Sequence, residues 1–103
     1  PDSVVAQMQG GIAHGISAAL WGEVKFAAGV PQVSNFSNYR VMRLSDMPVI
    51  AVQTVQTGAI DVGGVGETGV PCVAPAIANA YAKLTGNRVR ALPFHPGATM
   101  GGL

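Results

Sequence analysis

The first twenty residues carry the clearest hydrophobic pattern in the chain. Their apolar positions recur every three or four residues, as on one face of an α-helix: Val5, Met8, Ile12, Ile16 and Leu20. With Ser3 as a suitable N-cap, this pattern predicts a helix over residues 3–21. Gly10, Gly11 and Gly15 lie inside it, and each glycine costs a helix up to about 1 kcal/mol relative to alanine. We therefore expect another backbone or a ligand to lie very close to this helix.

Beyond residue 21 the pattern changes to short β-type runs separated by Gly and Pro. The predicted strands are residues 24–28 and 32–36, which form a hairpin around a turn at 29–31, followed by 38–42, 49–55 and 89–92. A second helix is predicted over residues 75–84, with Gly86 as a left-handed cap. This order of elements predicts an α+β fold, in which two helices pack on a mixed sheet and residues 1–103 form a single unit.

Composition narrows the class of protein. Of the 103 residues, 49% are hydrophobic and 11% are charged, and the net charge is +1. Such a chain is not a disordered segment, and without a run of Lys or Arg it offers no nucleic-acid surface. Residues 3–22 carry no formal charge, but their Gln, His and Ser side chains argue against a membrane span. We expect a chain this apolar to bury much of its surface against the rest of a larger protein.

A glycine-rich loop precedes the second predicted helix. Gly64, Gly66 and Gly69 match G-x-G-x-x-G, the dinucleotide-binding pattern. No Asp or Glu follows Glu67, so the acid that would bind a ribose is missing and we reject that interpretation.

Glu67 itself has two interpretations. No Lys or Arg lies within ten residues of it, and a carboxylate held in an apolar cleft without a cationic partner is suited to act as a general base. Alternatively, Glu67 is a surface residue that caps the second helix. The spacing alone does not decide between them.

Five stretches of the sequence together resemble a known family: residues 7–15 (QMQGGIAHG), 35–40 (NFSNYR), 46–48 (DMP), 63–71 (GGVGETGVP) and 74–80 (APAIANA). The resemblance is to the C-terminal end of the large subunit of the molybdenum hydroxylases, the superfamily of xanthine dehydrogenase and aldehyde oxidoreductase. Within it, the sequence is most similar to the isoquinoline 1-oxidoreductase β-subunit branch and related aldehyde dehydrogenase large subunits. The resemblance covers nearly the whole chain, and its specific part is GVGE followed by GVP.

The resemblance implies an enzyme that hydroxylates an electron-poor carbon of an N-heterocycle or aldehyde with oxygen from water. Members of this family hold molybdenum through molybdopterin, in bacteria usually as the cytosine dinucleotide, so no residue of the chain is expected to bind the metal itself. Iron–sulfur clusters on a partner subunit carry the electrons away. The Glu of the family's G-x-G-E motif, which takes a proton from the metal-bound hydroxyl, corresponds to Glu67.

The resemblance also implies a cofactor-contacting amide at Gln7, whereas Gln9 would face away on a helix. Gly10 and Gly11 would keep the helix slim beside the cofactor, and Gly66 would belong to the cofactor-binding loop. The alternative for Gln7 is an exposed amide near the start of the helix.

Other residues are expected to be structural. We interpret His14 as a packed histidine, because no Cys or acid at metal-ligand spacing accompanies it. Cys72 stands where the related pattern usually has a second Pro, and we expect it to be a small buried residue. Trp21, Phe26 and Tyr39 are expected in the core.

We therefore expect a cofactor-binding portion of a large subunit that is inactive alone. Its expected partners are the remainder of the large subunit, a small iron–sulfur subunit and a small-molecule substrate. The alternative is a non-catalytic, homodimeric interaction domain that kept the scaffold of this family. The sequence leaves open the substrate and the compartment, bacterial cytoplasm or periplasm.

Overall fold

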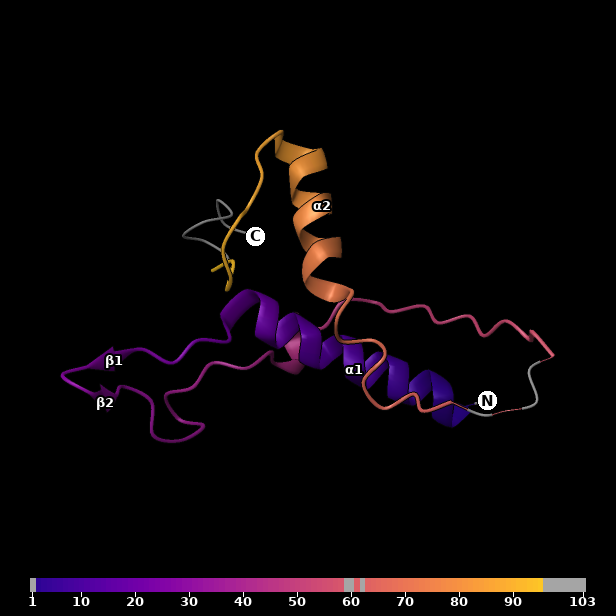
Figure 1. Ribbon diagram of the computed structural model, residues 1–103, viewed down its shortest axis with the longest axis horizontal. Helices are drawn as coiled ribbons and strands as arrows, with labels where there is room; N and C mark the ends of the chain where they lie inside the picture. The colour runs from indigo at the N-terminus through magenta and orange to yellow at the C-terminus, as the bar shows by residue number, and fades with distance from the viewer. Residues whose placement is uncertain (1, 59–60, 62, 96–103) are drawn as a thin grey trace.

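The computed structural model describes residues 2–58, 61 and 63–95 (Figure 1). Two helices dominate these residues: α1, Asp2–Trp21, and α2, Val73–Thr85. Between them in the chain lie the strands β1, Phe26–Ala27, and β2, Val30–Pro31, and the short 3-10 helix η1, Leu44–Asp46. The rest of the described chain consists of turns and extended loops.

Both predicted helices are confirmed, with slightly wider bounds. The prediction of Ser3 as the N-cap is wrong, because α1 already includes Asp2. α2 begins two residues earlier than predicted, at Val73, and has Pro75 in its first turn, where the missing N–H of proline costs little. It ends as predicted at Gly86, which has a φ of 75° and donates its N–H to the carbonyl oxygen of Ala82. Glycine adopts this left-handed conformation without a steric cost.

The predicted mixed sheet is wrong for the described residues. The hairpin exists, but its strands pair antiparallel over two residues each, with Phe26 opposite Pro31 and Ala27 opposite Val30. The hairpin packs against neither helix. The segments 38–42, 49–55 and 89–92 form no strands, because β-type side chains need a neighbouring strand and the described part of the chain provides none. The architecture of the described residues is therefore α+β, but it consists of two helices and a small antiparallel sheet instead of helices packed on a mixed sheet.

The two helices meet through a glycine. α2 rises from the middle of α1 (Figure 1), and Gly15 of α1 is buried at this contact. A Cβ on Gly15 would lie 2.6 Å from Cγ2 of Val73 and 3.0 Å from the carbonyl oxygen of Val70. The missing side chain therefore allows the start of α2 to sit directly on α1, as the glycines in this helix predicted.

The core is small and lies where the C-terminal segment returns to α1. Ala19 and Phe94 are 1% and 4% exposed, and side chains of α2 pack against them. The backbone N–H groups of Phe94 and His95 donate to the carbonyl oxygens of Ala19 and Leu20, at 2.8 and 3.0 Å. They thereby satisfy carbonyls that the end of a helix leaves without partners.

The surface is large for a chain of this size. It measures 7664 Å², whereas a folded monomer of 10.5 kDa exposes about 5400 Å². The radius of gyration is 16.4 Å, against about 13 Å for a compact domain of this length.

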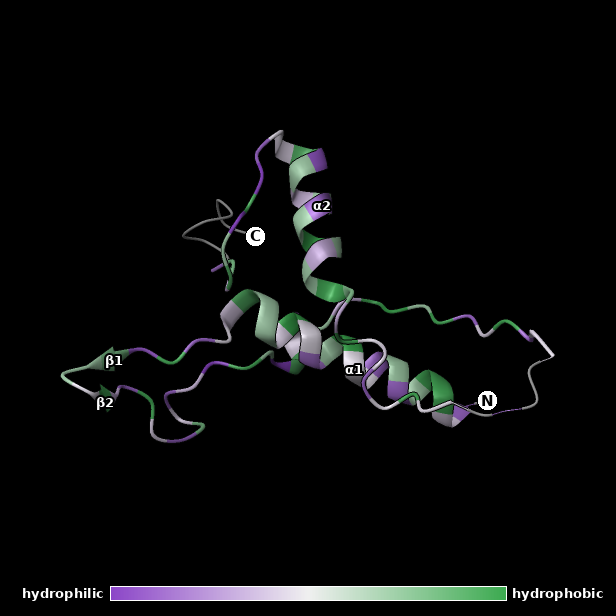
Figure 2. Cartoon of the chain, in the orientation of Figure 1, coloured by the Kyte–Doolittle hydropathy of each residue, from purple (hydrophilic) through white to green (hydrophobic). Residues whose placement is uncertain are grey.

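Figure 2 shows hydrophobic residues on the protruding hairpin, where Phe26 is 67% exposed. The prediction that Phe26 lies in the core is therefore wrong, while Trp21 and Tyr39 are half-buried.

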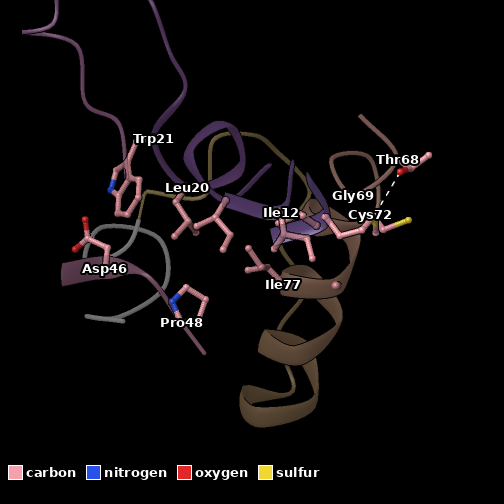
Figure 3. A pocket seen from close by; sticks show the side chains of 13 residues that line it. Ile12, Leu20, Trp21, Asp46, Pro48, Thr68, Gly69, Cys72 and Ile77 are labelled. Atoms are coloured by element: carbon pink, nitrogen blue, oxygen red, sulfur yellow. Dashed lines mark hydrogen bonds between the residues drawn. The ribbon is translucent and has the colours of Figure 1, made fainter. Parts of the chain in front are cut away.

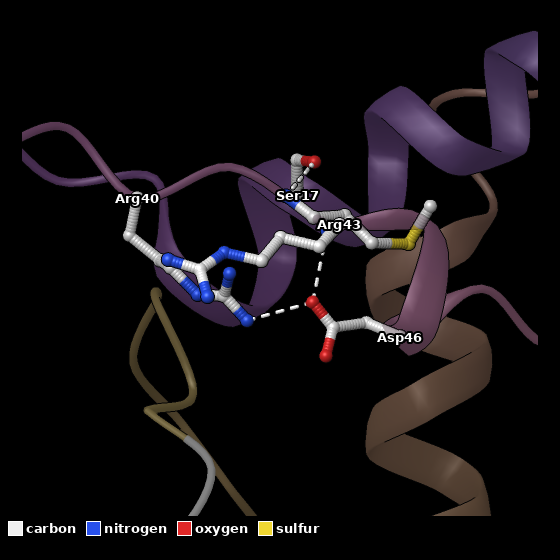
Figure 4. Close-up of polar contacts among 5 residues, drawn as sticks. Ser17, Arg40, Arg43 and Asp46 are labelled. Atoms are coloured by element: carbon white, nitrogen blue, oxygen red, sulfur yellow. Dashed lines mark hydrogen bonds and ion pairs between the residues drawn. The ribbon is translucent and has the colours of Figure 1, made fainter. Parts of the chain in front are cut away.

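An ion pair between Arg40 and Asp46 closes the loop before η1, and this loop also contacts the end of α1. The Asp46 carboxylate accepts hydrogen bonds from Arg40 Nη2 at 2.7 Å and from the backbone N–H of Arg43 at 2.8 Å (Figure 4). The Arg40 guanidinium also lies over the ring of Trp21, 4.3 Å from its centre. The Ser17 hydroxyl on α1 accepts a further hydrogen bond from the loop backbone. Contacts with Trp21 and Ser17 therefore hold this loop on α1.

We predict that Gly15→Ala lowers the free energy of unfolding of the full-length protein by about 1–2 kcal/mol, because the added Cβ overpacks the contact with Val73. Gly10→Ala, compared in the cofactor-free protein, is the matched control, since a Cβ there meets nothing within 4 Å. It should raise the stability by up to about 1 kcal/mol through helix propensity. Thermal unfolding measures both changes, and equal stabilisation by the two variants would contradict the close contact.

We predict that Asp46 makes the loop sensitive to acid. The hydrogen bond from the Arg43 backbone and, secondarily, the Arg40 guanidinium lower the pKa of Asp46 from its usual 3.8. Its stabilising contribution is therefore present above pH 3.8 and is lost as the pH falls through the lower folded-state pKa. Asp46→Asn should mimic this loss at neutral pH and accelerate hydrogen exchange at the Arg43 amide. Asp2→Asn, at the start of α1, should leave that exchange unchanged.

Candidate functional site

The predicted site residues meet around one hollow of about 660 Å³ between α1 and the glycine-rich loop. Gln7, Gly10 and Gly11 line this hollow from α1, and Gly66 and Glu67 line it from the loop. His14, Val70 and Pro71 complete its wall. We call it the polar hollow. Two segments that lie far apart in the sequence are thus brought together in one place.

Direct backbone packing holds the loop on α1. A Cβ on Gly69 would lie 3.1 Å from the carbonyl oxygen of Met8, and a Cβ on Gly11 would lie 3.6 Å from Cα of Gly69. The backbone N–H of Val70 donates to the carbonyl oxygen of Glu67 at 3.0 Å, so the loop makes a turn immediately before α2. This turn presents Glu67 at the edge of the polar hollow.

The Glu67 side chain is exposed and has no hydrogen-bond or ion-pair partner among the described residues. The capping interpretation is not supported, because the N-cap of α2 is Cys72 and its side chain makes no capping hydrogen bond. The described part of the chain therefore leaves this carboxylate available to a ligand.

The two glutamines of α1 have different surroundings. The Gln7 amide is exposed, and its Nε2 lies 4.0 Å from the position of a Cβ on Gly66. Gln9 faces away, as predicted, and donates from Nε2 to the carbonyl oxygen of Ile50 at 3.1 Å. Next to Gln7, Gly10 leaves its backbone bare, with nothing within 4 Å of where its Cβ would be.

His14 is the residue that sequence reasoning missed. The prediction of a packed histidine is wrong, because the side chain is exposed and lines the polar hollow. The signal was its spacing: Gln7, Gly10, Gly11 and His14 follow the pattern i, i+3, i+4, i+7, which is one face of a helix. This spacing places His14 on the same helix face as Gln7, the predicted cofactor-contacting amide.

A larger hollow of about 700 Å³ lies between α1 and α2 (Figure 3). It is lined mainly by apolar side chains, among them Ile12, Leu20 and Ile77. Cys72 lies at one end of it and Trp21 and Asp46 lie at the other (Figure 3). The prediction that Cys72 is buried is wrong, because its side chain is exposed. Because few polar groups line it, we call it the apolar hollow.

Neither a metal site nor a membrane helix is found among residues 2–58, 61 and 63–95. No three side chains of His, Cys, Asp or Glu gather there in an arrangement that could hold a metal ion. No helix in this part of the chain combines the length and apolar character that crossing a bilayer requires.

We predict that Cys72→Pro leaves the unfolding temperature of the full-length protein unchanged and its turnover within twofold of the wild type. Cys72 has a φ of −79°, which proline adopts, and its N–H makes no backbone hydrogen bond within the described chain. Thermal unfolding and turnover measure the two effects. A large loss of either would assign the thiol a role that its surroundings do not indicate.

The chain is similar to known proteins over nearly its whole length. Residues 1–48 match the family of the molybdopterin cofactor-binding domain. The chain is 47% identical over 96 residues, 93% of its length, to isoquinoline 1-oxidoreductase subunit beta of Brevundimonas diminuta. Over all 103 residues it is 31% identical to a membrane-bound aldehyde dehydrogenase of Gluconacetobacter polyoxogenes, whose name carries the qualifier pyrroloquinoline-quinone. No solved structure matches the chain.

The chain spans 12% and 13% of the lengths of these two relatives. The match to the cofactor-binding family includes the α1 side of the polar hollow, and the alignment with the second relative includes the Glu67 loop as well. The chain therefore belongs to the molybdenum hydroxylase large subunits and corresponds to a segment of such a subunit.

Proposed function

We propose that this chain supplies a proton-accepting carboxylate, Glu67, and a cofactor-binding amide, Gln7, to a molybdopterin-dependent hydroxylase. The reaction inserts oxygen from water at an electron-poor carbon of an N-heterocycle or an aldehyde. The observation that carries the proposal is the polar hollow, around which Gln7 and Glu67 lie together with three glycines.

The residues of the polar hollow fit a pterin cofactor. A bare glycine backbone at Gly10 leaves room for a flat group to approach α1, and the Gln7 amide can both donate and accept hydrogen bonds. Gly11 and Gly66 add no side chain to the space between them. When bound, the molybdenum–molybdopterin group, in our proposal the cytosine dinucleotide form, supplies the redox chemistry, and iron–sulfur clusters on a partner subunit receive the electrons.

Glu67 acts as the general base. Its carboxylate accepts the proton of the water-derived oxygen as that oxygen adds to the substrate carbon. No cation among the described residues competes for the carboxylate, so its oxygens remain free to accept a proton. The turn that precedes α2 keeps Glu67 at the edge of the polar hollow.

The exposed surface supports a large subunit around this chain. The chain exposes 7664 Å², about 2000 Å² more than a folded monomer of its mass. Exposed apolar side chains such as Val49 and Val55 lie in the extended segment that follows η1. We propose that the remainder of the large subunit covers this surface, and that a small iron–sulfur subunit binds that larger body.

The same excess of apolar surface favours a second candidate function, a non-catalytic domain that forms a homodimer. An obligate homodimer interface is large and hydrophobic, and would cover exposed side chains of this kind equally well. The two candidates differ in what Glu67 does, because a homodimer needs no free carboxylate beside a bare helix backbone.

We predict that Glu67→Gln in the full-length protein lowers kcat by 10²- to 10⁴-fold, the usual contribution of a general base, while the molybdenum content stays unchanged. Glu23→Gln is the matched control, because Glu23 pairs with Lys25 and His95 outside the polar hollow. Steady-state kinetics and metal analysis of the purified protein measure both effects.

Two results would count against the proposal. Wild-type turnover by Glu67→Gln would favour the non-catalytic dimer. Purified wild-type protein that contains pyrroloquinoline quinone and no molybdenum would assign it the cofactor named for the second relative.

A further inference from the structure

The polar hollow has two distinct ends. Gln7 and His14 lie seven residues apart on α1, which corresponds to about 10 Å along a helix axis. The loop runs beside them, with Gly66 close to Gln7 and the carbonyl oxygen of Val70 3.0 Å from the Cβ position of Gly15, the neighbour of His14. One end therefore carries the amide, and the other carries the imidazole.

The imidazole end combines a hydrogen-bonding group with apolar surface. Val70 and Pro71 line the hollow there together with His14. His14 also borders a second hollow of about 510 Å³, whose wall includes Phe36 and Tyr39. A flat ring that occupies this end meets apolar side chains and an imidazole, and the Glu67 carboxylate lines the same hollow from the loop.

His14 has no side-chain partner in the described part of the chain. The other described histidine, His95, lies 3.4 Å from the Glu23 carboxylate. His14 makes neither an ion pair nor a hydrogen bond with any described residue, although it lies on an ordered helix. Its ring nitrogens are therefore free to bind a ligand.

We propose that His14 is a substrate-contacting residue, whose imidazole N–H donates a hydrogen bond to the ring nitrogen of an N-heterocyclic substrate. Val70 and Pro71 pack against the ring of that substrate, and Gln7 holds the cofactor at the opposite end. A neutral imidazole carries one N–H donor, which matches the single acceptor of such a ring. This inference rests on the proposed function, since it uses Glu67 as the base that faces the same substrate.

The test measures binding without turnover. Full-length holoenzyme carrying Glu67→Gln is dialysed to equilibrium with isoquinoline, alone and in combination with His14→Ala or His14→Gln. We expect His14→Ala to weaken binding of isoquinoline about tenfold, the equivalent of one lost hydrogen bond, and His14→Gln to restore part of it. Naphthalene, which has the same shape without the nitrogen, should bind equally well to all of these proteins.

Controls separate a contact from a structural effect. His95→Asn should leave isoquinoline binding unchanged, because His95 lies outside the polar hollow. Adding His14→Ala to the Glu67→Gln holoenzyme should change neither its molybdenum content nor its unfolding temperature, because the His14 side chain is exposed.

The inference is overturned if His14→Ala leaves isoquinoline binding unchanged, or if it weakens naphthalene binding equally. It is also overturned if His14→Ala causes a loss of molybdenum, or if the Glu67→Gln holoenzyme with His14 intact binds no isoquinoline. The proposed function fails on a different result, namely wild-type turnover by Glu67→Gln. The two failures are therefore distinguishable.

Discussion

The contact between the bare backbone of α1 and the glycine-rich loop determines the rest of this structure. Gly11 and Gly15 on the helix and Gly69 on the loop have no side chains, and a Cβ on Gly15 or Gly69 would come within 3.1 Å of its neighbours. Because the two backbones touch, the loop cannot slide outward without losing the start of α2, which rests on Gly15. The polar hollow is a consequence of this packing, since the same contact brings Gln7 and Glu67 to its two sides.

The sequence predicted those parts of the molecule whose signals are local. The spacing of apolar residues and the Gly86 cap defined both helices, and the glycines of α1 indicated that another backbone would come close. The motif resemblance selected five residues, Gln7, Gly10, Gly11, Gly66 and Glu67, which the structure brings together around one hollow. Their chemical roles remain predictions. Helical spacing from Gln7 also predicts that His14 lies on the face of α1 that lines the polar hollow.

The failed predictions concern properties that depend on neighbours. Residues 49–55 have strand-like side chains, but a strand forms only when another strand accepts its hydrogen bonds, and none of the described residues does so. Phe26 and Cys72 were expected to be buried, yet burial requires a covering layer, and the described chain supplies little beyond the core at Ala19 and Phe94. These residues are of the types found in protein interiors, but the described part of this chain does not cover them.

The division of labour in the proposed enzyme follows from the side chains that the segment contains. The polar hollow offers an amide, an imidazole, a carboxylate and bare backbone. None of these groups transfers electrons, but each can position a molecule or move a proton. In the proposed enzyme, this segment therefore positions molecules and moves a proton, while the bound redox group supplies the electron transfer. Its contribution to the proposed reaction depends on the geometry between α1 and the loop, because that geometry sets where the Gln7 amide and the Glu67 carboxylate lie.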